Sequence, residues 1–395
     1  MADDEPPQLL ELDSVPEAGP STKNYDRPKV PITLLTGYLG AGKSTLLQYI
    51  LTAEHGYKIA VCMNDFGDTT DIEGVYRHPS KSLTLSDPTT QTTSSSFLSL
   101  PNGCLCCSVK DLGIAAIEEM VASAPGGVDW VVVELTGVAD PGPIVRTFWA
   151  NEEMGDLMLD GVICVVDSRN VLTQLAEERE AGEINECQKQ VACADVILLN
   201  KVDLVKPEQL SKVESTIRTL NPTLRVHHTT QSRMPLGDLF NIRAFSDSAG
   251  TGVRESQSQT PHNNHDHQYD HDHEHEHDDG LPHHSKITTT LIPLPPLTSF
   301  QFAKTKEFLE TLLWDRKYPS AEGSKTNSAP EILRTKGYIT LQDGTSHVLQ
   351  GVVDLFELKE VPKSEKEKVG DGKLVFIGRG VGEELKARFV EFVGL

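Results

Sequence analysis

The chain has 395 residues, of which 38% are hydrophobic and 24% charged, enough apolar content for a sizeable core in two ordinary domains. Lys and Arg number 36 against 58 Asp and Glu, so the formal net charge is −22 at pH 7. Because so acidic a chain with no local basic patch is repelled by phosphate backbones and anionic lipids, we expect neither a nucleic-acid nor a membrane partner.

The first residues and the cysteines indicate the compartment. The amino-terminal stretch is acidic and contains proline, and no apolar run reaches the length of a membrane span. We therefore expect neither a secretory or transit peptide nor a transmembrane helix. The seven cysteines are odd in number and three of them crowd together, which argues against a disulfide framework. Reduced thiols favour the cytoplasm, with the nucleus as a second candidate compartment.

The amino-terminal part of the chain alternates strands with helices. Residues 1–28 contain five prolines and little periodicity, which predicts a disordered acidic tail. Short apolar, β-branched runs predict buried strands at residues 30–35, 58–63, 130–134, 161–167 and 196–200. Helical patterns separate them at residues 44–53, 111–122 and 171–193, and the Ser-, Thr- and Pro-rich residues 78–101 are expected to form a long loop. This alternation predicts a doubly wound, mostly parallel α/β domain over residues 29–245.

A second, smaller domain follows a linker. Residues 246–286 hold nine of the 14 histidines among interleaved acids, and such a composition forms no core, so we expect a disordered His-rich linker. Apolar patterning resumes at residue 287. It predicts helices at residues 300–314 and 383–392, and strands at residues 337–342, 347–358 and 374–377. Residues 287–395 are therefore expected to form a small α+β domain.

A phosphate-binding loop is predicted between the first strand and the first helix. The residues match G-x-x-x-x-G-K-[ST], and their flanks disfavour the alternative, a glycine-rich turn with an accidental lysine. Backbone N–H groups of such a loop surround phosphate oxygens at the positive end of a helix. Lys43 is expected to reach the β and γ phosphates as a catalytic group, and the Ser44 hydroxyl to bind Mg²⁺. The predicted nucleotide-binding residues here are Gly37, Tyr38, Leu39, Gly40, Ala41, Gly42, Lys43, Ser44 and Thr45.

Two further motifs end predicted strands, at the edge where open α/β sheets bind ligands. Asn200, Lys201 and Asp203 resemble the N-K-x-D sequence of GTPases, whose Asp accepts hydrogen bonds that guanine supplies and adenine cannot. GTP is therefore expected over ATP. Glu134 and Gly137 stand where most GTPases have D-x-x-G. There the glycine N–H meets the γ phosphate and the acid holds a water of the Mg²⁺ shell, so both are catalytic candidates.

An acidic turn follows the second predicted strand, where a first switch segment would lie. It contains Asp65 and Asp68, and one of the two is expected near Mg²⁺ or near a second metal. A solvated acidic turn is the alternative for either residue alone.

Three thiols lie within one short loop, at Cys104, Cys106 and Cys107. Thiolates bind soft or borderline metals, and zinc is the best of the available ions. Three ligands on so short a loop leave the fourth position open or exchangeable, which suits transfer of the metal. Buried unreactive cysteines and a redox pair are the alternatives, and a disulfide between the adjacent Cys106 and Cys107 would be strained.

Taken in chain order, these motifs resemble the CobW-type family of metallochaperone GTPases. A C-x-C-C cluster inside a phosphate-loop GTPase is more specific than any single motif, and the resemblance extends through residues 334–337 and 349–352. It implies a phosphate-loop GTPase domain that uses GTP and Mg²⁺, zinc on Cys104, Cys106 and Cys107, and GTP-driven zinc delivery. It further implies that Cys107, Ser108 and Asp111 lie close to the nucleotide.

Within this family, the chain is most similar to the eukaryotic zinc-regulated GTPase metalloprotein activators. Those proteins carry an amino-terminal docking motif, Pro-x-Leu-Val-Pro. The segment Pro7-Gln8-Leu9-Leu10-Glu11 is similar to it, with Leu in place of Val and Glu in place of the last Pro. The resemblance implies a client metalloprotein that docks here, with type 1 methionine aminopeptidase as the candidate client.

Several alternatives stay open at this stage. The His-rich linker is either a loose metal reservoir or a solvated connection with incidental metal affinity. The chain as a whole is either a GTP-driven zinc carrier or a passive zinc buffer whose nucleotide site only senses GTP. Delivery of another metal such as cobalt is a further alternative, because thiolates do not by themselves choose zinc over its neighbours. An ATP-dependent enzyme is disfavoured by Asn200 and Asp203.

Overall fold

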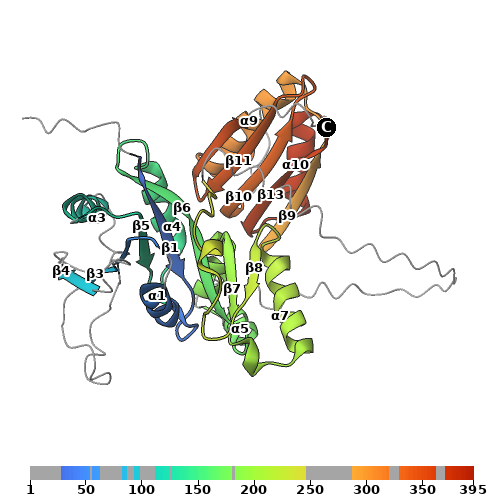
Figure 1. Cartoon of the computed structure of the whole chain (residues 1–395). Coiled ribbons are helices and arrows are strands. Elements are labelled where there is room, and N and C mark those ends of the chain that lie inside the picture. The colour runs from blue at the N-terminus through green and yellow to red at the C-terminus, as the bar shows by residue number, and fades with distance from the viewer. Residues whose placement is uncertain are drawn as a thin grey trace, which may run out of the picture.

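The computed structural model describes two sheets of different kinds (Figure 1). The described residues are 28–53, 56–62, 82–86, 93–97, 112–124, 126–179, 183–245, 287–319, 329–361 and 370–395. Within them, an eight-stranded sheet precedes a separate five-stranded sheet. A mostly parallel α/β domain followed by a smaller α+β domain is therefore confirmed. No helix in the described ranges is both long and apolar enough to cross a membrane.

The first sheet has the order β4-β3-β2-β5-β1-β6-β7-β8. Its six strands from β2 to β8 pair in parallel, whereas β3 and β4 add an antiparallel hairpin at one edge. The strands are β1 Val30–Thr36, β2 Ile59–Cys62, β3 Ser82–Ser86, β4 Thr93–Phe97, β5 Trp130–Glu134, β6 Leu157–Asp167, β7 Val196–Asn200 and β8 Arg225–His228. The carboxyl ends of β1, β5, β6 and β7 thus lie along one edge, which is where the sequence places its nucleotide motifs.

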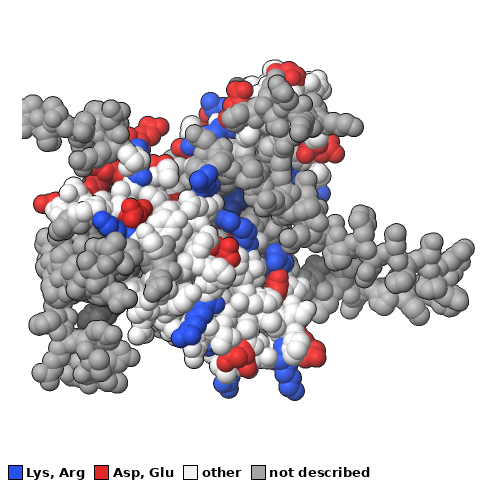
Figure 2. All heavy atoms as spheres, in the orientation of Figure 1, with Lys and Arg blue, Asp and Glu red and all other residues white. Residues whose placement is uncertain are grey.

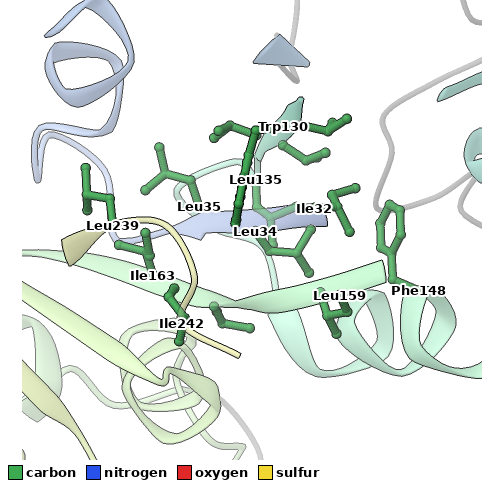
Figure 3. Close-up of a cluster of buried hydrophobic side chains, with 14 of the residues drawn as sticks. Ile32, Leu34, Leu35, Trp130, Leu135, Phe148, Leu159, Ile163, Leu239 and Ile242 are labelled. Atoms are coloured by element: carbon green, nitrogen blue, oxygen red, sulfur yellow. The ribbon is translucent and has the colours of Figure 1, made fainter. Parts of the chain in front are cut away.

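Helices cover both faces of this sheet. They are α1 Lys43–Thr52, α3 Leu112–Ser123, α4 Pro141–Ala150, α5 Val171–Ala176, α6 Glu186–Cys193 and α7 Pro207–Leu220, with short 3-10 turns η2 Val202–Leu204 and η3 Leu236–Asp238. Along β6, Ile163 and Val165 belong to the core cluster around β1, whereas Cys164 and Val166 pack with residues of α5, α6 and α7. Figure 3 shows the cluster around β1, in which Ile32 and Leu34 lie among side chains of β5, β6 and α4. Burial on both faces explains why the central strands β1, β5, β6 and β7 are mostly continuous apolar runs rather than alternating ones.

The second sheet is antiparallel, with the order β12-β11-β10-β13-β9. Its elements are β9 Thr288–Leu294, α9 Ser299–Leu313, β10 Glu331–Thr340, β11 Ser346–Val352, β12 Leu355–Val361, β13 Gly372–Arg379 and α10 Glu383–Val393. The helices α9 and α10 pack on one face, where Phe308 and Phe389 meet edge to face with ring centroids 5.1 Å apart. A capping box between Thr298 and Gln301 begins α9.

A buried ionic cluster joins the two sheets. Asp195 lies just before β7, and its Oδ1 accepts from Arg334 at 2.6 Å and from Lys336 at 2.8 Å, both on β10. The side chains are 3%, 0% and 8% exposed, so solvent screens the cluster very little. Burial raises the pKa of Asp195, but the two cations outweigh this effect and hold its pKa below the usual value.

On the surface, the charge is mixed: on the face shown in Figure 2, the described basic side chains lie interspersed with acidic ones.

Three expected elements were wrong. Residues 78–101 are not one long loop, because β3 and β4 pair within them and continue the sheet from β2. Residues 171–193 are not one helix, because Asn185 separates α5 from α6: its side chain accepts from Gln188 N–H at the start of α6 and donates to the Leu175 carbonyl at the end of α5. Residues 347–358 form two strands, β11 and β12, since the chain reverses at Val353 with a φ of 56°.

The remaining expected strands and helices occur, with ends that shift by a few residues. The strands at residues 130–134 and 196–200 have the expected bounds, whereas β6 begins earlier and β10 is longer than expected. Besides β3, β4 and the two 3-10 turns, the expectations did not include α4, α7, β8 and β9. The acidic tail and the His-rich linker lie outside the described residues.

Candidate functional site

The phosphate loop connects β1 to α1, and its backbone requires glycine. Gly37 and Gly42 have φ of 139° and 117°, in the region that favours glycine. A Cβ on Gly37 would lie 2.2 Å from the Val165 carbonyl oxygen, and a Cβ on Gly42 would lie 2.4 Å from Asn200 Nδ2. The loop is therefore packed closely against β6 and β7. Its N–H groups lead into the amino-terminal end of α1, an arrangement suited to phosphate.

Lys43 begins α1, and its ammonium group lies within the loop. Its Nζ donates to the carbonyl oxygens of Gly37 at 2.7 Å and of Tyr38 at 3.4 Å. Burial lowers the pKa of Lys43, and the nearby Glu134 carboxylate partly opposes this shift. A cation held by loop carbonyls can exchange these partners for phosphate oxygens, which bind an ammonium more strongly because they are charged.

Oxygen ligands suited to Mg²⁺ meet beside the loop. Ser44 Oγ donates to Glu134 Oε1 at 3.4 Å, and Glu134 ends β5 in register with Leu35 of β1. A hydroxyl and a carboxylate are the hard oxygen donors that Mg²⁺ prefers, and Ser44 is exposed, so these residues fit that ion. The parallel pairing of β1 and β5 brings together two residues that are 90 positions apart in the chain.

Gly137 lies directly against the phosphate loop. A Cβ on Gly137 would stand 2.8 Å from the Leu39 nitrogen and 2.9 Å from the Leu39 Cα, so a side chain is excluded by close approach. The chain reaches this position through Leu135, whose N–H donates to the Leu35 carbonyl at 2.8 Å, and through a turn closed by Ala139 N–H and the Thr136 carbonyl at 3.0 Å. The segment at residues 134–137, called the acid loop below, is thus packed directly against the phosphate loop.

Asn200 joins three loops at the end of β7. The side chain is 2% exposed, and its Nδ2 donates to the Ala41 carbonyl at 2.9 Å. Its Oδ1 accepts from the Thr229 hydroxyl at 3.2 Å and from Ser232 N–H at 2.8 Å. Asn200 therefore fixes the phosphate loop and the segment after β8 relative to β7. Asp203, at the η2 turn, is exposed and available to a base.

Lys201 crosses over the phosphate loop. It has a φ of 62°, and its Nζ donates to the Gly40 carbonyl at 2.8 Å and to Asp167 Oδ2 at 2.7 Å. Asp167 is 3% exposed, and hydrogen bonds from Lys201 and Asn170 lower its pKa in spite of burial. The carboxylate therefore stays ionised and holds the lysine in place.

Sequence reasoning missed two parts of this site. Asp167 is an acid at the carboxyl end of β6, a position that by itself indicates a ligand edge. Residues 229–232 follow β8 and pack on Asn200, with Gln231 and Ser232 at φ of 53° and 55°. No motif marks this segment, and only the pairing of β8 with β7 places it at the site.

The other predicted loop residues occupy the same neighbourhood. Tyr38 contributes its backbone to the loop, while its hydroxyl donates to Glu177 Oε2 at 2.9 Å beyond α5. Ala41 is buried, whereas Leu39 and Thr45 are exposed. Six predicted residues lie outside the described residues: Asp65, Cys104, Cys106, Cys107, Ser108 and Asp111. The segment from Pro7 to Glu11 and Asp68 lie outside them as well.

The described cysteines are poor metal ligands. They are Cys62, Cys164, Cys187 and Cys193, and all four are free. Burial raises the pKa of Cys62 and of Cys164 to about 12, and it raises those of the other two as well. Because metals bind the thiolate form, a raised pKa makes these four thiols weaker metal ligands. Within the described ranges, no group of three or more His, Cys, Asp or Glu could hold a metal ion.

The guanine preference of this site can be tested at Asp203. We expect the protein to bind GTP and GDP far more tightly than ATP, and Asp203→Ala to weaken guanine nucleotides by about a hundredfold, because two hydrogen bonds to a carboxylate are lost. Titration with fluorescent GDP, GTP and ATP analogues measures this. Glu208→Ala is the matched control, since it removes an exposed acid at the start of α7. Equal affinities for GTP and ATP in the unmodified protein would contradict the assignment.

Comparison with known proteins matches both domains. The profile described as CobW/HypB/UreG, nucleotide-binding domain, matches residues 31–228, and that of the cobalamin synthesis protein cobW C-terminal domain matches residues 298–392. Over 359 residues the chain is 33% identical to the zinc-regulated GTPase metalloprotein activator 1 of Schizosaccharomyces pombe, a match that covers 89% of this chain and 83% of that protein. It is 36% identical over 220 residues to the zinc chaperone YjiA of Escherichia coli, a match that covers 55% of this chain and 62% of that protein.

Comparison with solved structures identifies one of these same relatives. A crystal structure of Zn(II)-bound YjiA GTPase from Escherichia coli superposes with a TM-score of 0.63 at 26% identity, covering 92% of this chain and 99% of that one. The sequence similarity extends over nearly the whole chain, and the loop that binds phosphate, the acid beside it and the guanine motif meet at one sheet edge. The chain therefore belongs to the CobW/HypB/UreG family and is a GTPase, which hydrolyses GTP to GDP and phosphate.

Proposed function

We propose that this GTPase is a zinc metallochaperone, which couples GTP binding and hydrolysis to the transfer of zinc into a client metalloprotein. The observation that carries the proposal is the similarity, over 89% of the chain, to a protein named as a zinc-regulated GTPase metalloprotein activator. Relatives named as zinc chaperones and a Zn(II)-bound structural relative support it. In this account zinc is the cargo and GTP the source of free energy.

The chain's residues divide the work of hydrolysis among three loops. Lys43 binds the β and γ phosphates and stabilises the charge that develops on them. Ser44 and Glu134 would hold Mg²⁺, directly and through a water, and that ion supplies further charge stabilisation at the phosphates. The loops after β5 and β7 would orient the substrate: the Gly137 N–H would donate to the γ phosphate, and Asp203 would accept hydrogen bonds from the guanine edge.

Zinc is assigned to Cys104, Cys106 and Cys107. The support is chemical: these are three thiols in one short segment, and the other four cysteines have raised pKa values that oppose thiolate formation. Three thiolates leave one position of a tetrahedral zinc site for a fourth ligand, which a client can supply during transfer.

Coupling follows from where the thiols stand in the chain. They lie between the expected first switch segment at residues 64–68 and the acid loop at residues 134–137, both of which respond to the γ phosphate in phosphate-loop GTPases. Gly137 packs directly on Leu39 of the phosphate loop, so loss of the γ phosphate would change the contacts of the acid loop at this residue. The zinc site would then have one geometry for each nucleotide.

This proposal predicts that zinc affinity depends on the nucleotide. Binding coupling is reciprocal, and we expect about a tenfold or larger difference in zinc affinity between the states with a GTP analogue and with GDP. Competition with a zinc-binding dye, using protein that lacks residues 262–284, measures the difference without a contribution from the histidines. Changing Cys104, Cys106 and Cys107 to Ser should remove the site.

The outcome separates carrier from buffer. Identical zinc affinities in both nucleotide states, with and without an apo client, would show a passive zinc buffer that only shares its chain with a GTPase. Zinc retained after the triple change would refute the thiol assignment. The same titration with Co²⁺ tests delivery of cobalt, since thiolates alone do not select zinc.

Type 1 methionine aminopeptidase is the candidate client. The support is the similarity of Pro7-Gln8-Leu9-Leu10-Glu11 to the docking motif of the eukaryotic activators. The cytoplasm, with the nucleus as a second candidate compartment, is the proposed location, because reduced thiols are needed for this chemistry. Apo aminopeptidase serves as the acceptor in the zinc titration: a client accelerates the release of zinc during GTP hydrolysis, whereas an unrelated apo-enzyme does not.

A further inference from the structure

The loop that carries Gly137 is held from behind by one side chain of α6. Gln190 is 1% exposed, and its Nε2 donates to the carbonyl oxygens of Gly137 at 3.1 Å and of Ala139 at 3.2 Å. These carbonyls are 53 and 51 positions away in the chain. An amide nitrogen has two N–H donors, and both are used on this loop.

The contacts on the two sides of Gly137 determine the orientation of its peptide groups. On one side the residue packs on Leu39 of the phosphate loop. On the other, the Thr136 carbonyl accepts from Ala139 N–H at 3.0 Å, and the next carbonyl along, that of Gly137, accepts from Gln190. Because a glycine lacks the side chain that would restrict φ and ψ, these hydrogen bonds replace that restriction. The turn thus holds the peptide group that contains the Gly137 N–H, through the Thr136 carbonyl, and Gln190 holds the next peptide group, through the Gly137 carbonyl. With the peptide groups on both sides of its Cα held, the φ and ψ of Gly137 are fixed, and with them the direction of its N–H.

Gln190 lies on α6, and contacts at both ends of this helix hold it in place. Asn185 caps the start of α6 by accepting from Gln188 N–H at 2.8 Å, and just beyond the end of the helix Asp195 is held by Arg334 and Lys336. Lys189 also pairs with Asp140, 3.1 Å away, whose other oxygen caps α4 just after the loop. A helix fixed at both ends is a suitable support for a group that must hold its geometry to a fraction of an ångström.

We infer that Gln190 is a positioning residue for GTP hydrolysis: it keeps the Gly137 N–H directed at the γ phosphate. GDP lacks that phosphate. Gln190 therefore strengthens the binding of GTP and of the transition state for hydrolysis, and it leaves the binding of GDP unchanged. The inference rests on the GTPase activity alone and stands or falls independently of zinc delivery. Gln190 does not touch the substrate, so its role is exerted through the loop.

The test compares Gln190→Met with Gln188→Met. Gln188 lies on the same helix, is 2% exposed, and donates its Nε2 to the Leu175 carbonyl at 2.7 Å, away from the nucleotide loops. Both changes keep the approximate length of the side chain and remove buried hydrogen bonds of its amide group, so both are expected to lower the melting temperature. Fluorescent-nucleotide titration gives the ratio of GTP to GDP affinity, and single-turnover hydrolysis gives the rate of the chemical step.

For Gln190→Met we expect the GTP-to-GDP affinity ratio and the hydrolysis rate each to fall about tenfold, with GDP affinity unchanged. For Gln188→Met both quantities should stay within about twofold of the unmodified protein. If the two variants behave alike in both readouts, Gln190 is a structural residue only and the inference is overturned. If Gln190→Met fails to fold, Gln190→Leu, which also lacks the amide donors and adds no charge, is judged by the same two readouts.

Discussion

Replacing Lys43 by Ala is expected to abolish GTP hydrolysis while the fold persists. The Lys43 ammonium lies within the phosphate loop, 2.7 Å from the Gly37 carbonyl, and serves the phosphates instead of filling the core. Removal of one preorganised donor from a transition state slows a reaction by about a hundredfold to a thousandfold, and the loss of a full charge should reach the upper end of that range. Single-turnover hydrolysis of GTP measures the rate.

Lys212→Ala is the matched control, because Lys212 is an exposed lysine of α7 outside the site. It should leave the rate unchanged. Melting temperatures of both variants should lie within a few degrees of the unmodified protein, since the Lys43 ammonium group donates to the loop carbonyls of Gly37 and Tyr38 and does not fill the apolar core. Hydrolysis by Lys43→Ala within tenfold of the normal rate would remove Lys43 from the catalytic groups.

Asp195→Asn is expected to cause the largest loss of stability. The change leaves Arg334 and Lys336 buried without a compensating charge, and breaking a buried pair in this way costs about 3–5 kcal/mol. Two guanidinium nitrogens of Arg334, Nε and Nη1, already have no hydrogen-bond partner among the described residues. The other contacts of that guanidinium are Gln350 Oε1, 3.4 Å from Nη2, and the Phe245 ring centroid at 4.8 Å; both are uncharged and cannot replace the carboxylate. Denaturant unfolding measures the difference in free energy.

Asp354→Asn is a suitable control for this prediction. Asp354 pairs with Arg146 of α4, so this pair also joins the two domains, but the side chain of Arg146 is 45% exposed and that of Asp354 is 33% exposed. Exposed pairs contribute about 0–1 kcal/mol, and the control should lose no more than that. Adding Lys336→Met to Asp195→Asn should restore part of the stability, because one of the two uncompensated cations is removed. Equal losses for Asp195→Asn and Asp354→Asn would contradict the argument.

The same cluster has a pH signature. The pKa of Asp195 is lowered in the folded protein, so its contribution to stability is fully present above the ordinary aspartate pKa of 3.8. That contribution is lost as the pH falls below this value and through the lowered pKa of the folded state. In the Asp195→Asn protein this part of the acid destabilisation should be missing. Unfolding curves of the two proteins between neutral and acidic pH provide the comparison.

The sequence alone determined the parts of this protein that depend on neighbouring residues. The phosphate loop at residues 37–44 and the guanine motif at residues 200–203 are contiguous, and their chemistry follows from local backbone geometry and side-chain type. The strands at residues 130–134 and 196–200 were predicted with their observed bounds, because a strand buried on both faces is a short continuous apolar run. The resemblance to the CobW-type family rested on these same local motifs, taken in order.

Local pattern failed where a single residue interrupts an element. Asn185 divides α5 from α6 through hydrogen bonds to carbonyls ten and eleven positions earlier. Gly182, and Asn185 with Gln188 three positions later, are the local signals of that break within the otherwise helical pattern of residues 171–193. Val353 adopts a φ of 56°, which a β-branched residue rarely does, so β11 and β12 were expected as one strand. The hairpin of β3 and β4 has a Ser- and Thr-rich composition typical of loops, and its pairing with β2 supplies the order that its sequence lacks.

Only the tertiary structure decided which distant groups meet. Asp195 reaches Arg334 across 139 positions, and Asn200 reaches Ala41 across 159. In the sequence, Gln190 is one of several polar residues of an ordinary amphipathic helix. Only the folded structure shows that its amide contacts the Gly137 carbonyl. Such contacts produce no periodic pattern in the sequence, because each depends on how the strands and helices are placed relative to one another. They matter because a buried polar group that lacks its hydrogen bond is costly in free energy. The chemistry of the site was therefore readable from short motifs, whereas the residues that hold those motifs in position became visible only in the folded chain.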